Sequence, residues 1–338
     1  MRAIFWNIPG FGHVGRQSQL KEYMRKEGIN IVGLQETIKI DFRHHELLSI
    51  DPLERFSWNH LAAAGHSGGM LLGFDQAVYE RELVVIQVYG PADHSRSADF
   101  LGEVQTKVLS LSSLFIPLVV GGDFNLIRSG ADKNNCNINW PSVTMFNNAI
   151  ATMALREVAR SGAHYTWTNK QLPPVRSVLD RVFISPDWEL VYPLCSLVTE
   201  TRIGSDHVPL ILTSGEDRIR RSPRFFFETA WFEIPDFDSI FRVKWNFCVS
   251  QVGNQRGPME FWIAVGSRLR ASLKGWGANL GRENSNLRES LLSKIASLDQ
   301  QADARPFLEP EWARRYALED QVQPLLRAEE EYWRCQGA

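Results

Sequence analysis

Short apolar runs bounded by turn residues dominate the first 214 positions of the chain. Each run suits a β-strand that is buried on at least one face, and in chain order they are RAIFWNI, INIVGL, GGMLLGF, ELVVIQVY, IPLVVGG, VLDRVFIS and VPLILT. Segments with helical spacing lie between them. Leu20, Tyr23 and Met24 follow the i, i+3, i+4 pattern, and a longer periodic stretch covers residues 142–158. Strands that alternate with helices predict a layered α/β domain with helices packed outside the sheets.

The pattern changes after residue 214. A charged, proline-containing segment, GEDRIRRSPR, predicts a linker over residues 215–235. Beyond it, apolar positions recur at helical spacing, with one stripe from Leu287 to Leu298, and Pro324 predicts a kink in the last helix. We therefore expect an α/β domain over residues 1–214 and a mostly helical extension over residues 236–338.

Composition is that of an ordinary globular protein. Hydrophobic residues make up 44% and charged residues 22% of the 338 positions, which excludes wholesale disorder. No apolar run reaches the roughly 18 residues that a membrane span requires, and the N-terminus shows no secretory signal. The 4 cysteines lie far apart, which argues against a zinc ribbon or a disulfide scaffold and favours an intracellular protein.

Net charge is the one property that argues against a nucleic-acid partner. The formal charge is −2, and neither the part before residue 214 nor the part after it has a basic excess. Proteins that bind nucleic acids usually show such an excess. Composition alone therefore argues against DNA or RNA as a binding partner.

Polar side chains stand at the ends of the predicted strands, where an α/β sheet usually forms its site. Taken singly, each has an ordinary explanation as a turn residue, a solvated carboxylate, a core aromatic or a structural histidine. In chain order the set is Asn7, Glu36, Tyr89, Asp123, Asn125, Asp206 and His207.

The pair Asp123 and Asn125 has features that these ordinary explanations do not account for. Asp123 and Asn125 are two positions apart, so their side chains point the same way in an extended chain. Gly121 and Gly122 precede them and lack side-chain bulk, which suits the close approach of a ligand.

Asp180 is unusual because it lies inside an apolar strand, where an unpaired carboxylate is costly. The obvious partner is a histidine, and His207 stands beside another carboxylate in SDHVPL. A carboxylate–histidine pair with separate Asp, Glu and Asn groups is the inventory of metal-assisted phosphoryl transfer. Hard oxygen ligands suit Mg²⁺, and amide and phenol groups can stabilise charge on phosphate oxygens.

Seven motifs occur in a fixed order: WNIPGFG, LQET, SGG, VYGP, GGDFN, LDRVF and SDHVPL. Together they resemble the endonuclease/exonuclease/phosphatase superfamily, the fold of DNase I and the AP endonucleases. In more detail, the sequences of three segments resemble the endonuclease of plant LINE-type (non-LTR) retrotransposons. These segments are GGDFNLIRSGADKNN, HYTWTN and RSVLDRVFIS. The resemblance covers about residues 2–214. It implies an α/β/β/α sandwich of two packed sheets, followed here by the helical extension.

The resemblance implies a metal environment built from oxygen ligands. Glu36 would be the principal ligand, with Asn7 and Asp206 completing the metal and phosphate surroundings. The implied cofactor is Mg²⁺, with Mn²⁺ as the alternative. Many AP endonucleases carry an Asp where this chain has Pro9, so the resemblance does not extend to abasic-site specificity.

The resemblance also implies a set of catalytic roles. Asp123 would orient or deprotonate the attacking water, and Asn125 would contact the phosphate. His207, held in tautomer and charge by Asp180, would donate to the scissile phosphate. Tyr89 would hydrogen-bond a phosphate oxygen.

DNA contacts are expected from HYTWTN and the segment that follows it. Trp167, Asn169 and Arg176 would belong to a hairpin that reaches a groove, whereas the alternative for Trp167 is a core strand aromatic.

The leading hypothesis is a Mg²⁺-dependent endonuclease that nicks DNA and derives from a LINE-type element, with DNA as partner and the nucleus as its place of action. The alternatives are an inactive truncated retroelement remnant and a phosphomonoesterase on the same fold, since fold does not fix substrate. A membrane partner is not expected, and the sequence does not indicate an oligomeric state.

Overall fold

The computed structural model describes residues 1–13, 15–65, 67–78, 82–215, 236–252, 257–279 and 282–334. All but the first residue of the expected linker over 215–235 lies outside the described residues. The chain divides into two compact units. The larger comprises Met1–Arg218 and Leu291–Glu330, and the smaller comprises Ile219–Ser290 and Glu331–Ala338.

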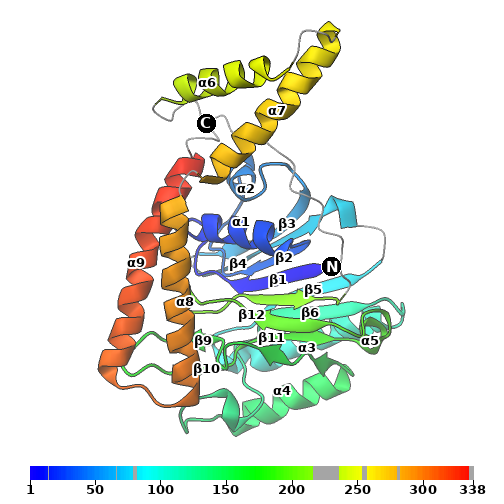
Figure 1. Cartoon of the computed structure of the whole chain (residues 1–338). Helices are drawn as coiled ribbons and strands as arrows, with labels where there is room; N and C mark the ends of the chain where they lie inside the picture. The colour runs from blue at the N-terminus through cyan, green and yellow to red at the C-terminus, as the bar shows by residue number, and fades with distance from the viewer. Residues whose placement is uncertain are drawn as a thin grey trace. The chain divides into compact units, whose positions relative to one another are not determined.

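A seven-stranded mixed sheet forms one layer of the larger unit (Figure 1). Its strand order is β3 (Phe56–Ala64), β4 (Ser67–Asp75), β2 (Ile31–Gln35), β1 (Arg2–Asn7), β13 (Leu210–Thr213), β12 (Ser196–Thr199) and β8 (Arg160–Ser161). β1 pairs parallel with β2 and antiparallel with β13. The carboxyl ends of β1 and β2 and the amino end of β13 therefore lie at one edge.

A four-stranded sheet forms the facing layer. Its strand order is β5 (Val84–Tyr89), β6 (Leu118–Asp123), β11 (Asp180–Ile184) and β7 (Arg156–Glu157). β5 pairs parallel with β6, and β11 pairs antiparallel with β6, with Asp180 opposite Asp123. A short antiparallel hairpin of β9 (Trp167–Thr168) and β10 (Arg176–Ser177) lies outside both sheets.

Alternation along β1 shows how the layers pack. Ile4 and Trp6 belong to a buried cluster with the apolar face of α1 (Arg16–Glu27). Ala3 and Phe5 point to the other face and belong to the cluster between the two sheets. Successive residues of a strand face opposite ways, so one apolar run supplies both cores.

Helices cover the outer face of each sheet. The apolar residue Ile50 of α2 (His44–Ile50) joins the cluster beneath α1, while α3 (Ser97–Ser112) and α4 (Trp140–Thr152) bury a third cluster against the four-stranded sheet. A short helix, α5 (Pro186–Val191), follows β11. The expected α/β/β/α sandwich is confirmed, and the fold is DNase I-like (Figure 1).

The glycines before Asp123 serve the packing of the sheets. A Cβ atom on Gly121 would lie 2.8 Å from the ring of Phe5, and one on Gly122 would lie 2.2 Å from the carbonyl oxygen of Val88. Both distances are too short for a side chain. The structure thus places Gly121 and Gly122 against protein atoms, which corrects the expectation that they leave room for a ligand.

The extension beyond residue 235 is helical, as expected, but it contributes to both units. α6 (Phe237–Ser250) and α7 (Pro258–Asn279) pack together through a small cluster that contains Cys248 and Val265. α8 (Arg282–Ala304) from Leu291 onward and α9 (Glu309–Arg334) as far as Glu330 belong to the larger unit. Pro324 lies inside α9. None of the described helices is both long and apolar enough to cross a membrane.

Candidate active site

Strand ends from both sheets meet at one edge of the sandwich. Asn7 ends β1, Tyr89 ends β5 and Asp123 ends β6, while Asp180 begins β11. Glu36 follows β2 directly, and the pair Asp206–His207 lies just before β13. The strand directions bring these ends together because β1 and β2 are parallel, β5 and β6 are parallel, and β11 and β13 run the opposite way.

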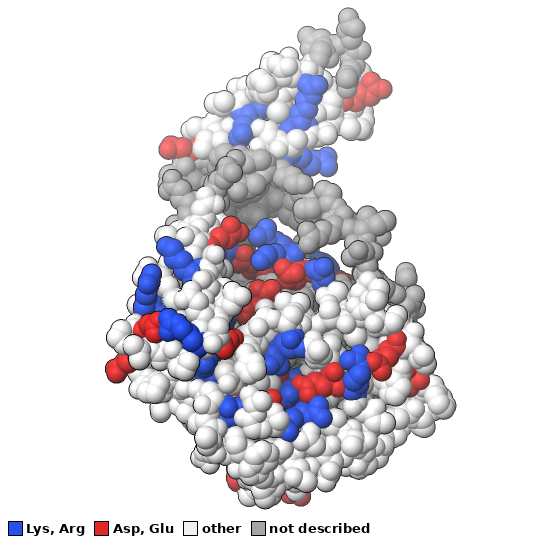
Figure 2. Space-filling view, turned by 60° about the horizontal axis from the view of Figure 1, so that its bottom comes forward, with Lys and Arg blue, Asp and Glu red and all other residues white. Residues whose placement is uncertain are grey.

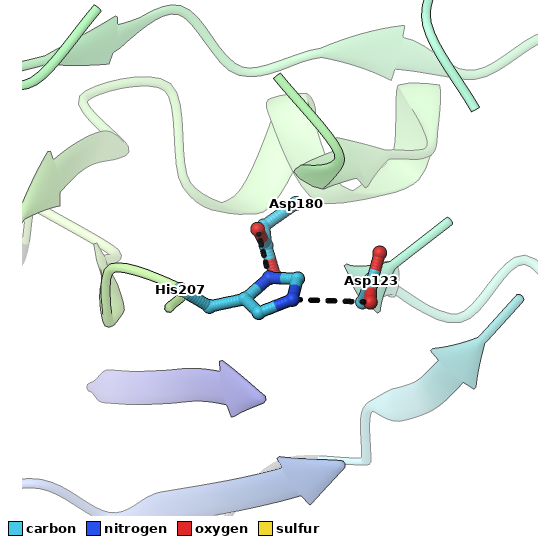
Figure 3. Close-up of side chains that lie close together, drawn as sticks. All are labelled: Asp123, Asp180 and His207. Carbon is cyan, nitrogen blue, oxygen red and sulfur yellow. Dashed lines mark hydrogen bonds and ion pairs between the residues drawn. The ribbon is translucent and has the colours of Figure 1, made fainter. Parts of the chain in front are cut away.

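His207 lies between two buried carboxylates (Figure 3). Its Nδ1 is 2.8 Å from Oδ2 of Asp180, and its Nε2 is 3.8 Å from Oδ2 of Asp123. The three residues are 4% exposed or less. The expected pairing of Asp180 with His207 is therefore present in the structure.

Asp123 is held by amide donors on both of its oxygens. The side-chain amide of Asn7 donates to Oδ2 at 2.9 Å, and the backbone N–H of Asn125 donates to Oδ1 at 2.9 Å. Asn125 has a φ of 52°, and its own side chain donates to the carbonyl of Gly90 at 2.8 Å. The Asn125 side chain is thus fixed beside Asp123.

Charge and burial act in opposite directions on these groups. Burial by itself lowers the pKa of His207, but Asp180, Asp123 and Asp206 outweigh it and raise the pKa to about 10. Burial raises the pKa of Asp123, although the charge of His207 opposes the shift. His207 is therefore an imidazolium at neutral pH, with a proton on Nε2 as well as on Nδ1.

Glu36 and Tyr89 complete the rim of the site. Burial raises the pKa of the Glu36 carboxyl, and the charge of His207 opposes that shift. Burial also raises the pKa of Tyr89, and the neighbouring carboxylates of Glu36, Asp123 and Asp206 add to the increase. Tyr89 therefore keeps its phenolic proton and remains a hydrogen-bond donor.

Asp206 is fixed by the β9–β10 hairpin. The indole N–H of Trp167 donates to Oδ2 of Asp206 at 2.9 Å, and the backbone N–H of Thr168 donates to the Asp206 carbonyl at 3.1 Å. Ser205 links the same segment to β1, because its hydroxyl donates to the carbonyl of Asn7 at 2.9 Å. The loop that carries Asp206 is thus attached to two separate elements.

Two buried oxygens of the site fit a hard metal ion. Oδ1 of Asn7 and Oδ1 of Asp206 have no hydrogen-bond partner among the described residues, although both are shielded from solvent. A buried oxygen without a partner is costly, and a divalent cation is a suitable partner for it. With the carboxylate of Glu36 nearby, the donor set consists of hard oxygens, which Mg²⁺ prefers.

A second group in the described residues could hold a metal by geometry alone. Ligand atoms of Asp123, Asp180 and His207 lie within 4.8 Å of one another. A protonated imidazole has no free lone pair, however, so the raised pKa of His207 favours the ion-paired arrangement over coordination by its nitrogen.

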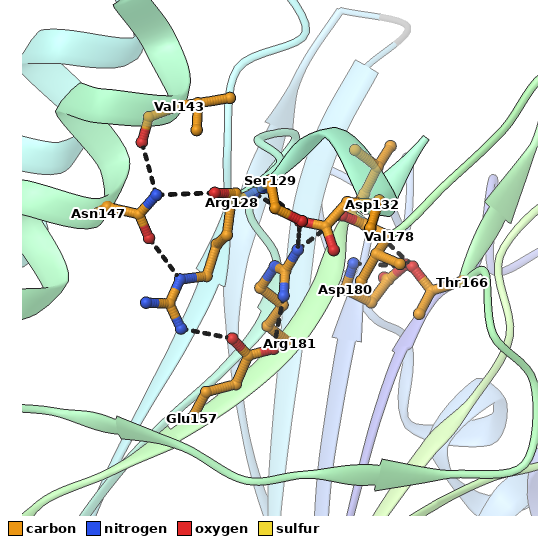
Figure 4. A network of polar contacts seen from close by, with 12 residues as sticks. Arg128, Ser129, Asp132, Val143, Asn147, Glu157, Thr166, Val178, Asp180 and Arg181 are labelled. Carbon is orange, nitrogen blue, oxygen red and sulfur yellow. Dashed lines mark hydrogen bonds and ion pairs between the residues drawn. The ribbon is translucent and has the colours of Figure 1, made fainter. Parts of the chain in front are cut away.

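A buried polar network supports the strand that carries Asp180 (Figure 4). Arg181, which is 4% exposed, forms ion pairs with both Asp132 and Glu157. On the other side, the hydroxyl of Thr166 accepts the backbone N–H of Asp180 at 3.0 Å. These contacts fix the backbone from which Asp180 reaches His207.

Family comparison agrees with this geometry. Residues 4–207 match the model of the Endonuclease/Exonuclease/phosphatase family, which is more than half of the chain. The chain belongs to this family. No curated protein matches the chain.

Several solved structures share the fold at low sequence identity. A variant of the 3′ phosphatase NExo from Neisseria, bound to a product DNA hairpin, is 17% identical with a TM-score of 0.51, covering 63% of this chain and 98% of that one. An AP endonuclease from Archaeoglobus fulgidus is 14% identical with a TM-score of 0.51, again covering 63% and 98%. The AP endonuclease LMAP from Leishmania major is 13% identical with a TM-score of 0.50, covering 62% and 86%. These structures show the shared fold, and membership of the Endonuclease/Exonuclease/phosphatase family supports a hydrolase.

Arg16 is a site residue that the sequence pattern did not reveal. Its guanidinium donates to the carbonyls of Gly10 at 3.0 Å and Gly204 at 2.8 Å. Burial lowers the pKa of Arg16, while the carboxylates of Asp206 and Glu36 oppose the shift. One feature that could have pointed to a role for Arg16 is its place at the first position of α1, where a positive charge is unfavourable with respect to the helix dipole.

The residues expected to contact DNA are engaged within the chain. Trp167 holds Asp206, and the side-chain oxygen of Asn169 accepts the backbone N–H groups of Gln171 and Val175. Arg176 pairs with Asp303 at 2.9 Å, and its guanidinium stacks on the rings of Tyr165 and Trp312. Trp167, Asn169 and Arg176 thus have structural roles within the chain. Their contact with DNA stays a prediction.

Surface charge is mixed on the face shown in Figure 2. Lysine and arginine side chains alternate there with aspartate and glutamate side chains. This arrangement agrees with the net charge of −2. Recognition of a polyanion by this face would depend on local groups rather than on a continuous basic field.

Proposed function

We propose that this protein is a Mg²⁺-dependent phosphodiesterase that nicks DNA and derives from a LINE-type retrotransposon. The observation that carries the proposal is the buried Asp180–His207–Asp123 array beside the unpartnered oxygens of Asn7 and Asp206. The retrotransposon origin is supported by the sequences of three segments, GGDFNLIRSGADKNN, HYTWTN and RSVLDRVFIS. A chromosomal substrate would place the activity in the nucleus.

Proton handling in the reaction falls to two of these residues. Asp123, with both oxygens oriented by amide donors, accepts a proton from the attacking water as the water oxygen bonds to phosphorus and the ester P–O bond breaks. The leaving alkoxide takes up a proton from solvent water and departs as the alcohol. His207 presents its Nε2–H on the same side as Asp123 and donates to the phosphate oxygens, where negative charge increases in the transition state. Asp180 keeps the imidazolium charged and oriented.

Three residues would hold the metal: Glu36, Asp206 and Asn7. When bound there, Mg²⁺ supplies positive charge that offsets the charge of the phosphate. Tyr89, which retains its proton, donates a further hydrogen bond to a phosphate oxygen. DNA is the proposed substrate because one structural neighbour in the family was solved with a DNA hairpin.

A plasmid-nicking assay tests this proposal. Wild-type protein should convert supercoiled plasmid to the open circle with Mg²⁺, and EDTA should abolish the conversion. His207→Ala and Asp206→Ala should each reduce the rate at least about 100-fold, because they remove a transition-state donor and a metal ligand. Asp320→Asn, which changes an exposed carboxylate on α9, should leave the rate unchanged.

The same assay separates the alternatives. Equal nicking by the wild type and both active-site variants would show that the activity comes from elsewhere. Release of phosphate from an oligonucleotide 3′-phosphate without nicking would indicate a phosphomonoesterase instead. A folded wild-type protein that does neither with Mg²⁺ or Mn²⁺ would indicate an inactive remnant.

A further inference from the structure

The helical extension reaches the catalytic domain through a buried ion cluster on α9. Arg315, which is 0% exposed, donates from Nε to Asp299 at 2.9 Å and from Nη2 to the carbonyl oxygen of Arg202 at 2.8 Å. Its Nη1 pairs with Glu319 one turn further along the helix. A buried guanidinium is tolerated only when its donors are satisfied, and here a catalytic-domain carbonyl is one of the acceptors.

Glu319 makes the complementary contacts. It is 5% exposed, and its Oε1 accepts the backbone N–H of Gly204 at 3.0 Å and the ammonium of Lys170 at 3.1 Å. Its Oε2 is 3.9 Å from the guanidinium of Arg202. Burial alone would raise the pKa of Glu319, but Arg315, Lys170 and Arg202 outweigh it and lower the pKa. The carboxylate is therefore charged and fully engaged.

These contacts fall on the segment that leads directly into the site. Residues 202–204 immediately precede Ser205, Asp206 and His207. Gly204 is held from two sides, because Glu319 accepts its N–H while Arg16 donates to its carbonyl at 2.8 Å. Its φ of 70° is one that glycine adopts readily.

Glu319 also reaches the second support of Asp206. Lys170 follows Trp167 and Thr168, which donate to the side chain and the carbonyl of Asp206 respectively. Glu319 therefore contacts both segments that fix Asp206, one through the backbone N–H of Gly204 and the other through the ammonium of Lys170.

Apolar packing keeps α9 against this loop. Ile203, which is 2% exposed, packs in a cluster with Ile295 of α8 and with Val322 and Leu326 of α9. A Cβ atom on Gly15 would lie only 2.8 Å from Cβ of Leu326, so the start of α1 approaches α9 closely as well. Apolar contacts therefore hold the hairpin of α8 and α9 against the loop, in addition to the ion pairs of Arg315 and Glu319.

We propose that Glu319 and Arg315 are positioning residues for the active site, which set the loop of residues 202–207 and through it Asp206 and His207. This inference rests on the proposed nuclease function. It also gives the helical extension a role, because α9 would then position residues of the active site. Neither residue touches the reacting atoms, so their removal should affect the rate of the chemical step more than the binding of DNA.

The test compares variants of the full-length protein. Glu319→Ala removes the acceptor for Gly204, whereas Glu319→Gln keeps one acceptor oxygen and replaces the other oxygen, with the charge, by an NH2 group. Misplacement of a catalytic group by about 1 Å can cost about 100-fold in rate, so we expect kcat for plasmid nicking to fall about 100-fold in the first and about 10-fold in the second. KM for the plasmid should change less than about twofold.

Glu311→Gln is the matched control. It makes the same substitution on the same helix and breaks the pair between Glu311 and Arg305, which does not contact the catalytic loop. Its kcat should equal that of the wild type. Arg315→Lys, which keeps the charge but loses the planar set of donors, should resemble Glu319→Gln.

Hydrogen exchange of the peptide that contains residues 202–208 gives a readout independent of activity. Exchange there should be faster in Glu319→Gln than in the wild type and unchanged in Glu311→Gln. Wild-type kcat together with wild-type exchange in Glu319→Gln would overturn the inference, as would an equal effect in Glu311→Gln. If the Ala variant does not fold, the Gln variant decides. An inactive wild type contradicts the nuclease proposal, whereas the exchange measurement still tests the positioning of the loop.

Discussion

Asp180→Asn tests the proposed mechanism most directly, because Asp180 acts on His207 through Nδ1, whereas Nε2 faces Asp123 (Figure 3). The substitution preserves the size of the side chain and removes its charge. The contact that changes is the 2.8 Å hydrogen bond between Asp180 Oδ2 and His207 Nδ1, both of them buried. The imidazole would lose the partner that holds its charge and its orientation.

The expected size of the effect follows from that one bond. A hydrogen bond to a charged group contributes about 1.5–3 kcal/mol, and each 1.36 kcal/mol in the barrier corresponds to about tenfold in rate. We therefore expect kcat for Asp180→Asn to fall by roughly 10- to 150-fold. KM for the plasmid should remain within about twofold, since Asp180 is 2% exposed and cannot reach DNA.

Steady-state nicking of supercoiled plasmid at saturating Mg²⁺ measures both constants. Asp41→Asn is the control, because it makes the same change beside an exposed histidine, His60, 3.6 Å away. If Asp180→Asn keeps the wild-type kcat while His207→Ala is inactive, then His207 does not depend on Asp180 and the reasoning is refuted. A rise in KM with unchanged kcat would refute it equally.

Three further predictions concern packing, metal affinity and pH. Gly121→Ala should destabilise the fold by about 1–3 kcal/mol in urea unfolding, because the added methyl group meets the aromatic ring of Phe5 between the sheets. Gly102→Ala, at an exposed position of α3, should be neutral or stabilising. Trp167→Phe removes the indole donor from Asp206, so the Mg²⁺ concentration for half-maximal nicking should rise about 10- to 100-fold, and an unchanged Mg²⁺ requirement would exclude that role. Because the folded state lowers the pKa of Glu319, its contribution to stability is present above its ordinary pKa and is lost as pH falls through the lowered value. The difference in Tm between wild type and Glu319→Gln should therefore disappear in acid, and a difference that persists there would contradict the linkage.

The strand-end residues of the site were predictable because their positions follow from local pattern. Asn7, Glu36 and Asp123 each come at or just after the end of an apolar run, and parallel pairing brings such ends together. The pairing of Asp180 with His207 was also predictable, since an interior carboxylate requires a partner. These inferences needed strand direction and burial but no knowledge of the loops.

The supports of the site were not predictable in the same way. Gly204 bonds to Arg16 and to Glu319 across 188 and 115 positions of sequence, and neither contact leaves a periodic signature. Trp167 was expected in a hairpin that reaches a DNA groove, or else as a core strand aromatic, and neither expectation includes its hydrogen bond to Asp206. Side-chain hydrogen bonds between loops depend on how the loops pack, and sequence pattern does not encode that packing.

The charges of the site give the clearest argument for metal-dependent DNA binding. Four carboxylates outnumber the two nearby cations, which are the imidazolium of His207 and the guanidinium of Arg16, so the site alone should repel a phosphodiester. The carboxylates are those of Glu36, Asp123, Asp180 and Asp206. A bound divalent cation would offset this excess negative charge where the phosphate lies. The inactive His207→Ala variant should therefore bind a labelled duplex more tightly with Mg²⁺ than with EDTA at matched ionic strength. Adding Asp206→Ala, which removes a metal ligand, should abolish that difference. Equal affinity with and without Mg²⁺ would mean that DNA is held by surfaces away from the carboxylates.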